Sequence, residues 1–325
     1  MVREIILGLL AIALSALGAF MISRFACRLG LIDQPTTRSS HSHETPKGGG
    51  IGMAVAFLVT TVVLDMPTAF WLPLGAMAGL SLRGDQVEIS PKLRLPVQFV
   101  LMGILVIGTG EGIYQDIPRI LIALFWIVFI VGTANFYNFM DGINGIAGIS
   151  GAVGFGLLAF ATYKDHPEVG LLATCMALAC LGFLPFNLPR ARVFMGDVGS
   201  ILLGSTFAGL VYLGSRTVLD FLCMASFLFP FYADELTTMI VRLRAGENLT
   251  QAHRRHIYQL LANERQIPHW RISAAYGFFQ LLVGLSVLLC KPLGVAAVLA
   301  VLATWFVMFG LGGYYVRKQK TEDRR

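Results

Sequence analysis

The chain has 325 residues, of which 56% are hydrophobic and 14% are charged, and its mean hydropathy is +0.70. Since roughly a quarter of the residues of an average soluble domain are charged, this composition excludes such a domain and indicates a protein that crosses a membrane several times. The formal net charge of +6 is interpreted as a signal of membrane orientation and of contact with membrane lipids, and no nucleic acid partner is expected.

Long apolar stretches, separated by clusters of charge, proline and glycine, predict an all-α polytopic membrane fold. A spanning helix needs about 20 mostly apolar residues. Eleven stretches come near this length, at 4–22, 49–64, 67–82, 95–110, 118–134, 146–162, 169–185, 201–215, 219–240, 272–289 and 293–316. Because several of them are short for a span, ten helices are kept as an alternative. We expect residues 1–325 to form a single integral membrane domain.

The basic residues predict the orientation of the helices, because cytoplasmic loops hold an excess of Lys and Arg. With the N-terminus outside, few of the 25 basic residues fall on the outer side. These are Arg3, Arg119, Lys164, Arg216 and Lys291. We therefore expect an outer N-terminus and a cytoplasmic C-terminus.

The polar chemistry lies in the predicted inner loops, which are long, whereas the outer loops are a few residues long. The inner loops are 23–48, 83–94, 135–145, 186–200 and 241–271. A transporter would place ionisable groups near the bilayer midplane on broken helices. Chemistry gathered at one membrane face favours an enzyme with its active site facing the cytoplasm, and a nucleotide-sugar or lipid-phosphate transporter is the alternative.

The loop 135–145 repeats polar side chains every three residues. Asn135, Asn138 and Asp141 would share one helix face, and Asn144 follows. Their oxygens are ligands of the kind that Mg²⁺ prefers. Helix capping and turn formation are the alternative for any single one of them, but four such residues at a membrane boundary favour a binding site.

The carboxylates of two other loops are further candidates. Asp197 stands between Gly196 and Gly199, and glycine lets the backbone approach a metal or a phosphate closely. The alternative is that Asp197 is the N-cap of the helix predicted from residue 201. Asp85 is one more carboxylate at the end of a predicted helix.

Basic residues and histidines of the inner loops suit phosphate groups. Lys47 precedes three glycines whose backbone would be able to cradle a phosphate, with a flexible basic linker as the alternative. His253 and His256 lie three residues apart beside Arg254, so they predict an electropositive helix face suited to a diphosphate. Zinc is disfavoured because no third ligand type lies nearby.

Four segments carry a family resemblance over nearly the whole chain. They read R-S-S-H-x-x-x-T-P-K-G-G-G at 38–50, N-x-x-N-x-x-D-G-x-N-G at 135–145, F-M-G-D-x-G-S at 194–200 and G-E-N-x-x-x-A-H-R-x-H-x-Y-Q at 246–259. In this order they resemble the polyprenyl-phosphate N-acetylhexosamine-1-phosphate transferases, the superfamily of the cell-wall muramoyl-pentapeptide enzymes. The last segment resembles the branch that initiates O-antigen synthesis.

The resemblance implies a Mg²⁺-dependent transfer of a sugar 1-phosphate from a UDP-N-acetylhexosamine to undecaprenyl phosphate, with release of UMP. Mn²⁺ is the alternative metal. The sugar, direct against covalent transfer, and a homodimer are left open. Among the site residues, the resemblance implies metal binding by Asn138 and Asp197, uracil recognition by Asn144, phosphate contact by Lys47, diphosphate or sugar contact by His253, Arg254 and His256, and catalytic support from Asp85 and Asp141, with Asn135 in the substrate-binding set.

One position departs from the family pattern. Where the family usually has two adjacent aspartates, this chain has Gly84 followed by Asp85. Either Asp85 alone suffices for the reaction, or the missing carboxylate lowers activity.

Overall fold

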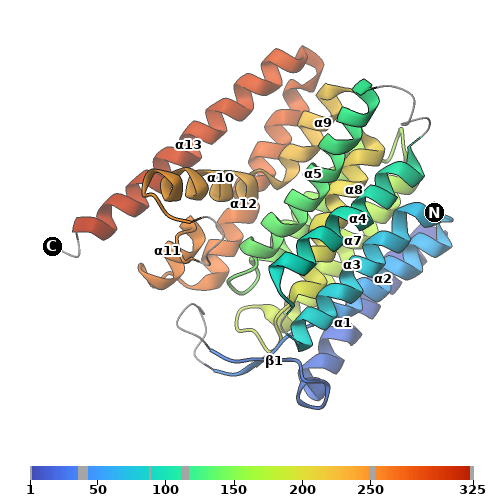
Figure 1. The fold of residues 1–325 in the computed structure, drawn as a ribbon, viewed down its shortest axis with the longest axis horizontal. Helices are drawn as coiled ribbons and strands as arrows, with labels where there is room; N and C mark the ends of the chain where they lie inside the picture. The colour runs from blue at the N-terminus through green and yellow to red at the C-terminus, as the bar shows by residue number, and fades with distance from the viewer. Residues whose placement is uncertain (1, 36–42, 88, 111–116, 249–252, 323–325) are drawn as a thin grey trace.

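The computed structural model describes residues 2–35, 43–87, 89–110, 117–248 and 253–322. Almost all of the regular secondary structure in this part of the chain is helical (Figure 1). The all-α prediction is confirmed for these residues, apart from one small hairpin. The long helices are α1 (Val2–Leu29), α2 (Ile51–Val63), α3 (Thr68–Gln86), α4 (Pro91–Thr109), α5 (Ile117–Met140), α6 (Ile146–Thr162), α7 (Pro167–Asn187), α8 (Asp197–Gly214), α10 (Phe229–Arg244), α12 (His269–Cys290) and α13 (Val295–Glu322).

Seven of the described helices are long and apolar enough to cross a membrane by length and composition, namely α1, α4, α5, α7, α8, α12 and α13. The helices α2 and α6 are apolar but shorter. These helices coincide with predicted apolar stretches, so a protein that crosses the membrane several times is confirmed. The total number of spans and the sidedness of the termini stay predictions.

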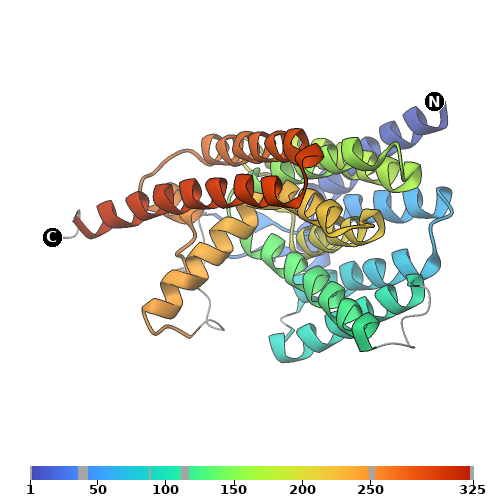
Figure 2. The ribbon, with the colours of Figure 1, turned by 90° about the horizontal axis from the view of Figure 1, so that it is seen from above.

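The predicted span 219–240 is not one continuous helix, and that prediction is wrong. The chain forms the short helix α9 (Val218–Ala225), the 3₁₀ turn η2 (Ser226–Leu228) and then α10. Pro230 stands in the first turn of α10, where a missing N–H is tolerated, whereas inside a continuous helix proline would break the hydrogen-bond ladder. In Figure 2, α10 leaves the bundle at an angle.

Close helix packing places the core around α7 and α8. Within the apolar window of α8, 83% of the residues are buried, against 6% for α13, which lies at the edge of the bundle. A Cβ on Gly204 of α8 would lie 2.8 Å from the Cα of Ala134 in α5. Small residues that let backbones approach in this way are the usual basis of helix association in membranes, where apolar burial gives little net drive.

The connections that carry the predicted site residues meet at one end of the bundle (Figure 1). The helices α1, α3, α5 and α7 end there, and α2, α4, α6 and α8 begin there. A two-stranded antiparallel hairpin, β1 (Ile32–Asp33) with β2 (Thr45–Pro46), lies at the same end. The short helices α11 (Ile257–Asn263) and η3 (Lys291–Leu293) complete the described elements. The alternating directions therefore gather loops that are far apart in sequence.

Candidate active site

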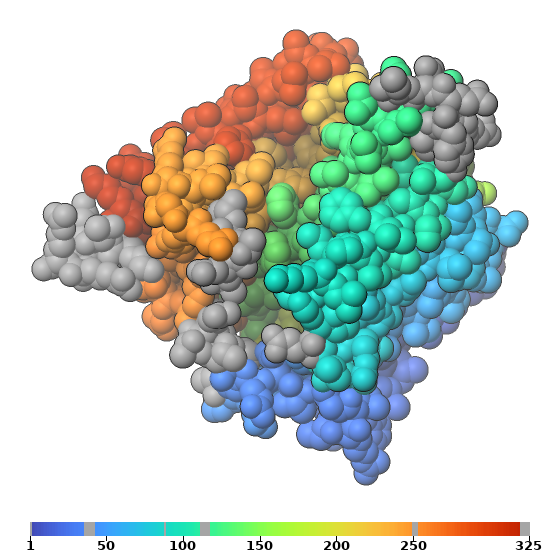
Figure 3. Space-filling view, in the orientation of Figure 1, coloured from blue at the N-terminus to red at the C-terminus, as the bar shows by residue number. Residues whose placement is uncertain are grey.

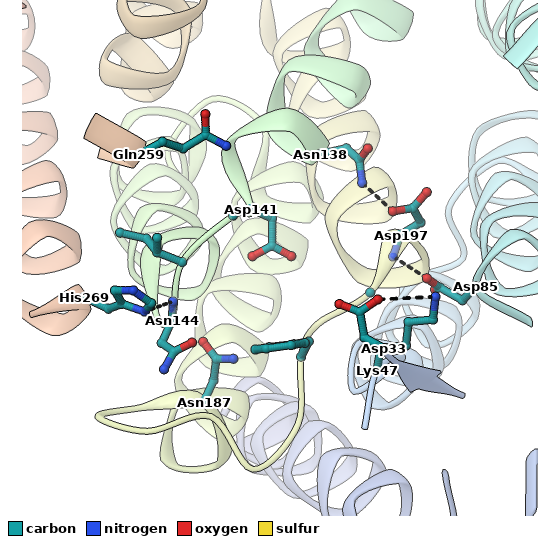
Figure 4. Close-up of a pocket in the computed structure, with 14 residues that line it drawn as sticks. Asp33, Lys47, Asp85, Asn138, Asp141, Asn144, Asn187, Asp197, Gln259 and His269 are labelled. Atoms are coloured by element: carbon teal, nitrogen blue, oxygen red, sulfur yellow. Dashed lines mark hydrogen bonds and ion pairs between the residues drawn. The ribbon is translucent and has the colours of Figure 1, made fainter. Parts of the chain in front are cut away.

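A cleft of about 300 Å³ opens where these loops meet (Figure 4). In Figure 3 the surface is hollowed between α4, in teal, and the orange region of α10 and α11, with α5 behind them. Six of the predicted site residues line the cleft: Lys47, Asp85, Asn138, Asp141, Asn144 and Asp197. The four others, Asn135, His253, Arg254 and His256, do not line it.

Asp85 holds the first turn of α8. Its Oδ1 accepts the backbone N–H of Asp197 at 3.1 Å and its Oδ2 accepts that of Val198 at 3.1 Å. The N-cap residue is Gly196, which has no side chain to do this, so the alternative that Asp197 is the N-cap is wrong. A carboxylate at this position also stabilises the positive end of the helix dipole.

The Asp197 carboxylate contacts two side chains from neighbouring helices. Asn138 donates from Nδ2 to Oδ1 at 2.8 Å, and the Arg94 guanidinium of α4 lies 2.6 Å from Oδ2. Asn138 also donates to Ser200 Oγ at 2.9 Å. The two predicted metal ligands are therefore adjacent, and Arg94 neutralises the aspartate in this structure.

Asp141 projects into the middle of the cleft, just beyond the end of α5 (Figure 4). Burial raises the pKa of Asp141 well above its usual range, and the negative charges of Asp197 and Asp85 raise it further. A hard cation at this carboxylate-rich place would relieve that repulsion, so the donor set fits Mg²⁺. The described residues contain no compact group of three or more His, Cys, Asp and Glu ligands, so water or substrate phosphate would complete its coordination.

Lys47 reaches the cleft from the hairpin, and two of the three glycines after it have their amides occupied. The Lys47 ammonium lies 3.9 Å from Asp33 Oδ1. The N–H of Gly49 donates to the Phe194 carbonyl and that of Gly50 to the Met195 carbonyl, at 2.9 and 2.8 Å. These two amides are thus committed to the loop before α8, and phosphate contact by Lys47 stays a prediction.

The opposite end of the cleft is built around Asn144. Its backbone N–H donates to His269 Nδ1 at 3.3 Å, and its carbonyl accepts from Ser273 Oγ at 2.8 Å. The next N–H, of Gly145, donates to Asn187 Oδ1 at 2.5 Å. Among the described residues, those that line this end include no carboxylate, which separates it chemically from the end at Asp197 (Figure 4).

Asn135 is turned toward α4 instead of the cleft. Its Nδ2 donates to Gln98 Oε1 at 2.8 Å and to the Val131 carbonyl at 2.8 Å. Residues three apart drift around the helix axis, so the three side chains do not point in one direction. The first of them faces the neighbouring helix. Its predicted substrate contact therefore has no support from this geometry.

The histidine segment lies behind the cleft wall. The His256 side chain is 4% exposed, with Nδ1 3.6 Å from Asp234 and Nε2 3.5 Å from Glu235. Burial, followed by the charge of His256, lowers the pKa of His253 to about 4. A diphosphate contact by His253, Arg254 or His256 stays a prediction that would require this segment to move.

Four polar residues that line the cleft were missed by the sequence reasoning. They are Asp33, Asn187, Gln259 and His269. Asp33, Asn187 and His269 lie inside the predicted inner loops 23–48, 186–200 and 241–271, and Gln259 ends the last motif, so a polar residue in a predicted loop was a usable signal. The signal is weakest for His269, because nine residues of chain separate it from that motif.

Comparison with known proteins agrees with the resemblance that the motifs carry. The profile of glycosyl transferase family 4 matches residues 67–215, which hold Asp85, Asn138, Asp141, Asn144 and Asp197. The decaprenyl-phosphate N-acetylglucosaminephosphotransferase of Mycobacterium tuberculosis is 26% identical, over 82% of this chain and 77% of its own length.

Two further relatives agree with this match. The undecaprenyl-phosphate alpha-N-acetylglucosaminyl 1-phosphate transferase of Thermotoga maritima is 28% identical over 82% of this chain and 85% of its own. The phospho-N-acetylmuramoyl-pentapeptide-transferase of Staphylococcus saprophyticus is 33% identical over 53% of this chain and 55% of its own. With the helical fold and the conjunction of motifs in one cleft, these matches confirm the resemblance to the superfamily of polyprenyl-phosphate N-acetylhexosamine-1-phosphate transferases, and residues 67–215 are similar to glycosyl transferase family 4.

Proposed function

We propose that this protein is a Mg²⁺-dependent enzyme that transfers an N-acetylhexosamine 1-phosphate from a UDP-sugar to undecaprenyl phosphate, releasing UMP at the cytoplasmic face of the bacterial inner membrane. The observation that carries the proposal is the single cleft that joins Lys47, Asp85, Asn138, Asp141 and Asp197 at one end of an apolar helix bundle. A site in that place is open to a polar donor and lies beside the headgroup level of a lipid acceptor.

The reaction joins two anions, so neutralisation of charge is the main catalytic task. Bound at Asn138 and Asp197, Mg²⁺ would neutralise the donor diphosphate and favour UMP as the leaving group. Lys47 supplies a positive charge on the same side of the cleft, next to Asp85 and Asp33 (Figure 4). Arg94, released from Asp197, would be positioned to bind a phosphate oxygen of either substrate.

The position of Asp85 supports direct attack by the lipid phosphate on the phosphorus that bears the sugar. A covalent aspartyl phosphate on Asp85 would engage one of the two oxygens that accept from α8 and remove the negative charge of this carboxylate. Either change would loosen the turn that holds Asp197. We therefore assign Asp85 to positioning of α8 and leave the attack to the acceptor.

A role in O-antigen synthesis rests on the segment 246–259, which resembles that branch of the superfamily. The test is UMP release by the purified protein in detergent, with undecaprenyl phosphate, Mg²⁺ and a series of UDP-N-acetylhexosamines. We expect UMP to form only when both substrates and the metal are present. Movement of an intact UDP-sugar into vesicles without UMP release would overturn the proposal in favour of a transporter.

A further inference from the structure

Three backbone groups of the turn at Asn144 and Gly145 are paired with side chains. The Asn144 N–H donates to His269, the Asn144 carbonyl accepts from Ser273, and the Gly145 N–H donates to Asn187. The first two side chains come from α12 and the third from α7. These three backbone groups thus depend on helices that are distant in sequence.

The turn needs this support because only its carbonyls at Ile143 and Gly145 accept from the start of α6. Gly145 has φ +86°, a left-handed conformation, and α6 begins only at the following residue. A buried peptide group without a partner is destabilising, so the three side chains stabilise this conformation of the turn. Ser273 is fully buried and Asn187 is 6% exposed, so both act from inside the protein.

His269 lines the cleft, as Asn187 does, but the Asn187 amide is already used on the Gly145 N–H and the Val193 carbonyl. The His269 Nδ1 accepts a hydrogen bond, so the proton of the neutral ring is on Nε2. That leaves the Nε2–H as a donor for a ligand. In Figure 4, His269 lies next to Asn144, at the far side of the cleft from Asp197.

We propose that His269 recognises the nucleoside part of the donor in two ways: it positions the Asn144 turn through Nδ1, and it donates from Nε2 to an acceptor oxygen of the pyrimidine or ribose. The inference rests on the proposed function, since it takes the end at Asp197 for the diphosphate. With the phosphates there, the carboxylate-free end is left for the uncharged nucleoside, which suits Asn144, Asn187 and His269.

Two variants separate the two contacts. In His269→Asn the carbonyl oxygen replaces Nδ1 as an acceptor for the Asn144 N–H, but nothing replaces the Nε2–H. In His269→Gln the amide replaces the Nε2–H, but the acceptor for Asn144 is lost. His166→Asn is the matched control, because His166 lies at the other end of the bundle beside the start of α7.

The measurements are the affinity for UMP by calorimetry, without turnover, and the KM values for donor and acceptor. We expect each His269 variant to weaken UMP binding and raise the donor KM by about tenfold, as loss of one hydrogen bond does, and His269→Ala by more. The KM for undecaprenyl phosphate should not change. The melting temperature of each variant checks that it is folded.

Wild-type affinity for UMP in His269→Ala, or a loss confined to the acceptor KM, would overturn the inference while leaving the proposed function intact. If only one of His269→Asn and His269→Gln weakens UMP binding, His269 acts only through the contact which that variant lacks. That result would overturn the two-sided role. If the wild-type protein neither binds UMP nor releases it, the proposed function itself fails.

Discussion

At the scale of single residues, Asp197 is the residue to which we assign both metal binding and contact with neighbouring charges. Its two oxygens are occupied by Asn138 and Arg94, and its backbone N–H by Asp85. Side chains of α3, α4 and α5 therefore hold Asp197 in place. A change of this side chain tests the metal assignment with little effect on the core, because Asp197 is only partly buried.

Asp197→Asn should lower turnover by about a hundredfold or more, because it keeps the size of the side chain but removes the charge that would hold Mg²⁺. UMP release over a titration of MgCl₂ is the measurement. Asp165→Asn, on an exposed turn at the other end of the bundle, should behave as wild type. Near-normal activity of Asp197→Asn at low Mg²⁺ would place the metal elsewhere.

Gly84→Asp should raise turnover by about tenfold or more, because it restores a second carboxylate beside Asp85. A Cβ at this position would meet only Ile89 Cδ1, at 3.9 Å, so the structure has room for the side chain. Turnover and melting temperature are compared with those of Gly84→Asn, which lacks the charge. An unchanged or lower rate in Gly84→Asp would show that Asp85 alone is sufficient.

At the scale of elements, α11 is tied to the bundle by one buried carboxylate. Asp234 of α10 accepts from the N–H groups of Ile257 and Tyr258, at 2.8 and 3.3 Å, and from the Tyr276 hydroxyl of α12 at 2.6 Å. The Tyr258 hydroxyl in turn donates to the Phe139 carbonyl, just before the site loop. The histidine segment therefore supports the cleft wall through this network.

Asp234→Ala should release α11 from this network, since removing the acceptor leaves buried donors unpaired, at a cost of about 3 kcal/mol or more. Trypsin should then cut after Arg254 or Arg255 faster than in the wild type. Asp220→Ala, whose partner Lys291 lies at the other end of the bundle, is the control. Equal cleavage rates in all three proteins would contradict the role of Asp234.

At the scale of the whole molecule, the alternating helices separate two ends with different chemistry. The turn at 163–166 lies at one end and the segment 264–268 at the other, near the cleft. Most of the basic residues lie at the cleft end. By the excess of Lys and Arg in cytoplasmic loops, that end faces the cytoplasm in our proposal.

Cysteines at positions 165 and 264 test this orientation, because Asp165 and Glu264 are both exposed. They are introduced singly after Cys27 and Cys290 have been replaced by alanine. An impermeant thiol reagent added to intact cells should label Asp165→Cys only, and the reagent added to inverted vesicles should label Glu264→Cys only. Labelling of both positions from the same side would overturn the topology.

The sequence by itself determined the membrane class, the helical fold and most of the cleft. Apolar length and charge clusters act locally, so they predicted most helices, and the spacing of Asn138, Asp141 and Asn144 predicted one loop as a site. The break before Pro230 was missed because the length of an apolar stretch does not show whether a turn interrupts the helix.

Only the tertiary structure decided which distant residues act together. Asp85 caps a helix that begins 112 residues later, Arg94 pairs with Asp197 103 residues away, and His269 contacts Asn144 across 125 residues. Such contacts depend on how closely helices pack, as at Gly204 against Ala134, and no local pattern encodes that distance. For the same reason Asn135 and His256 share motifs with the site residues but face neighbouring helices, while His269, outside every motif, lines the cleft.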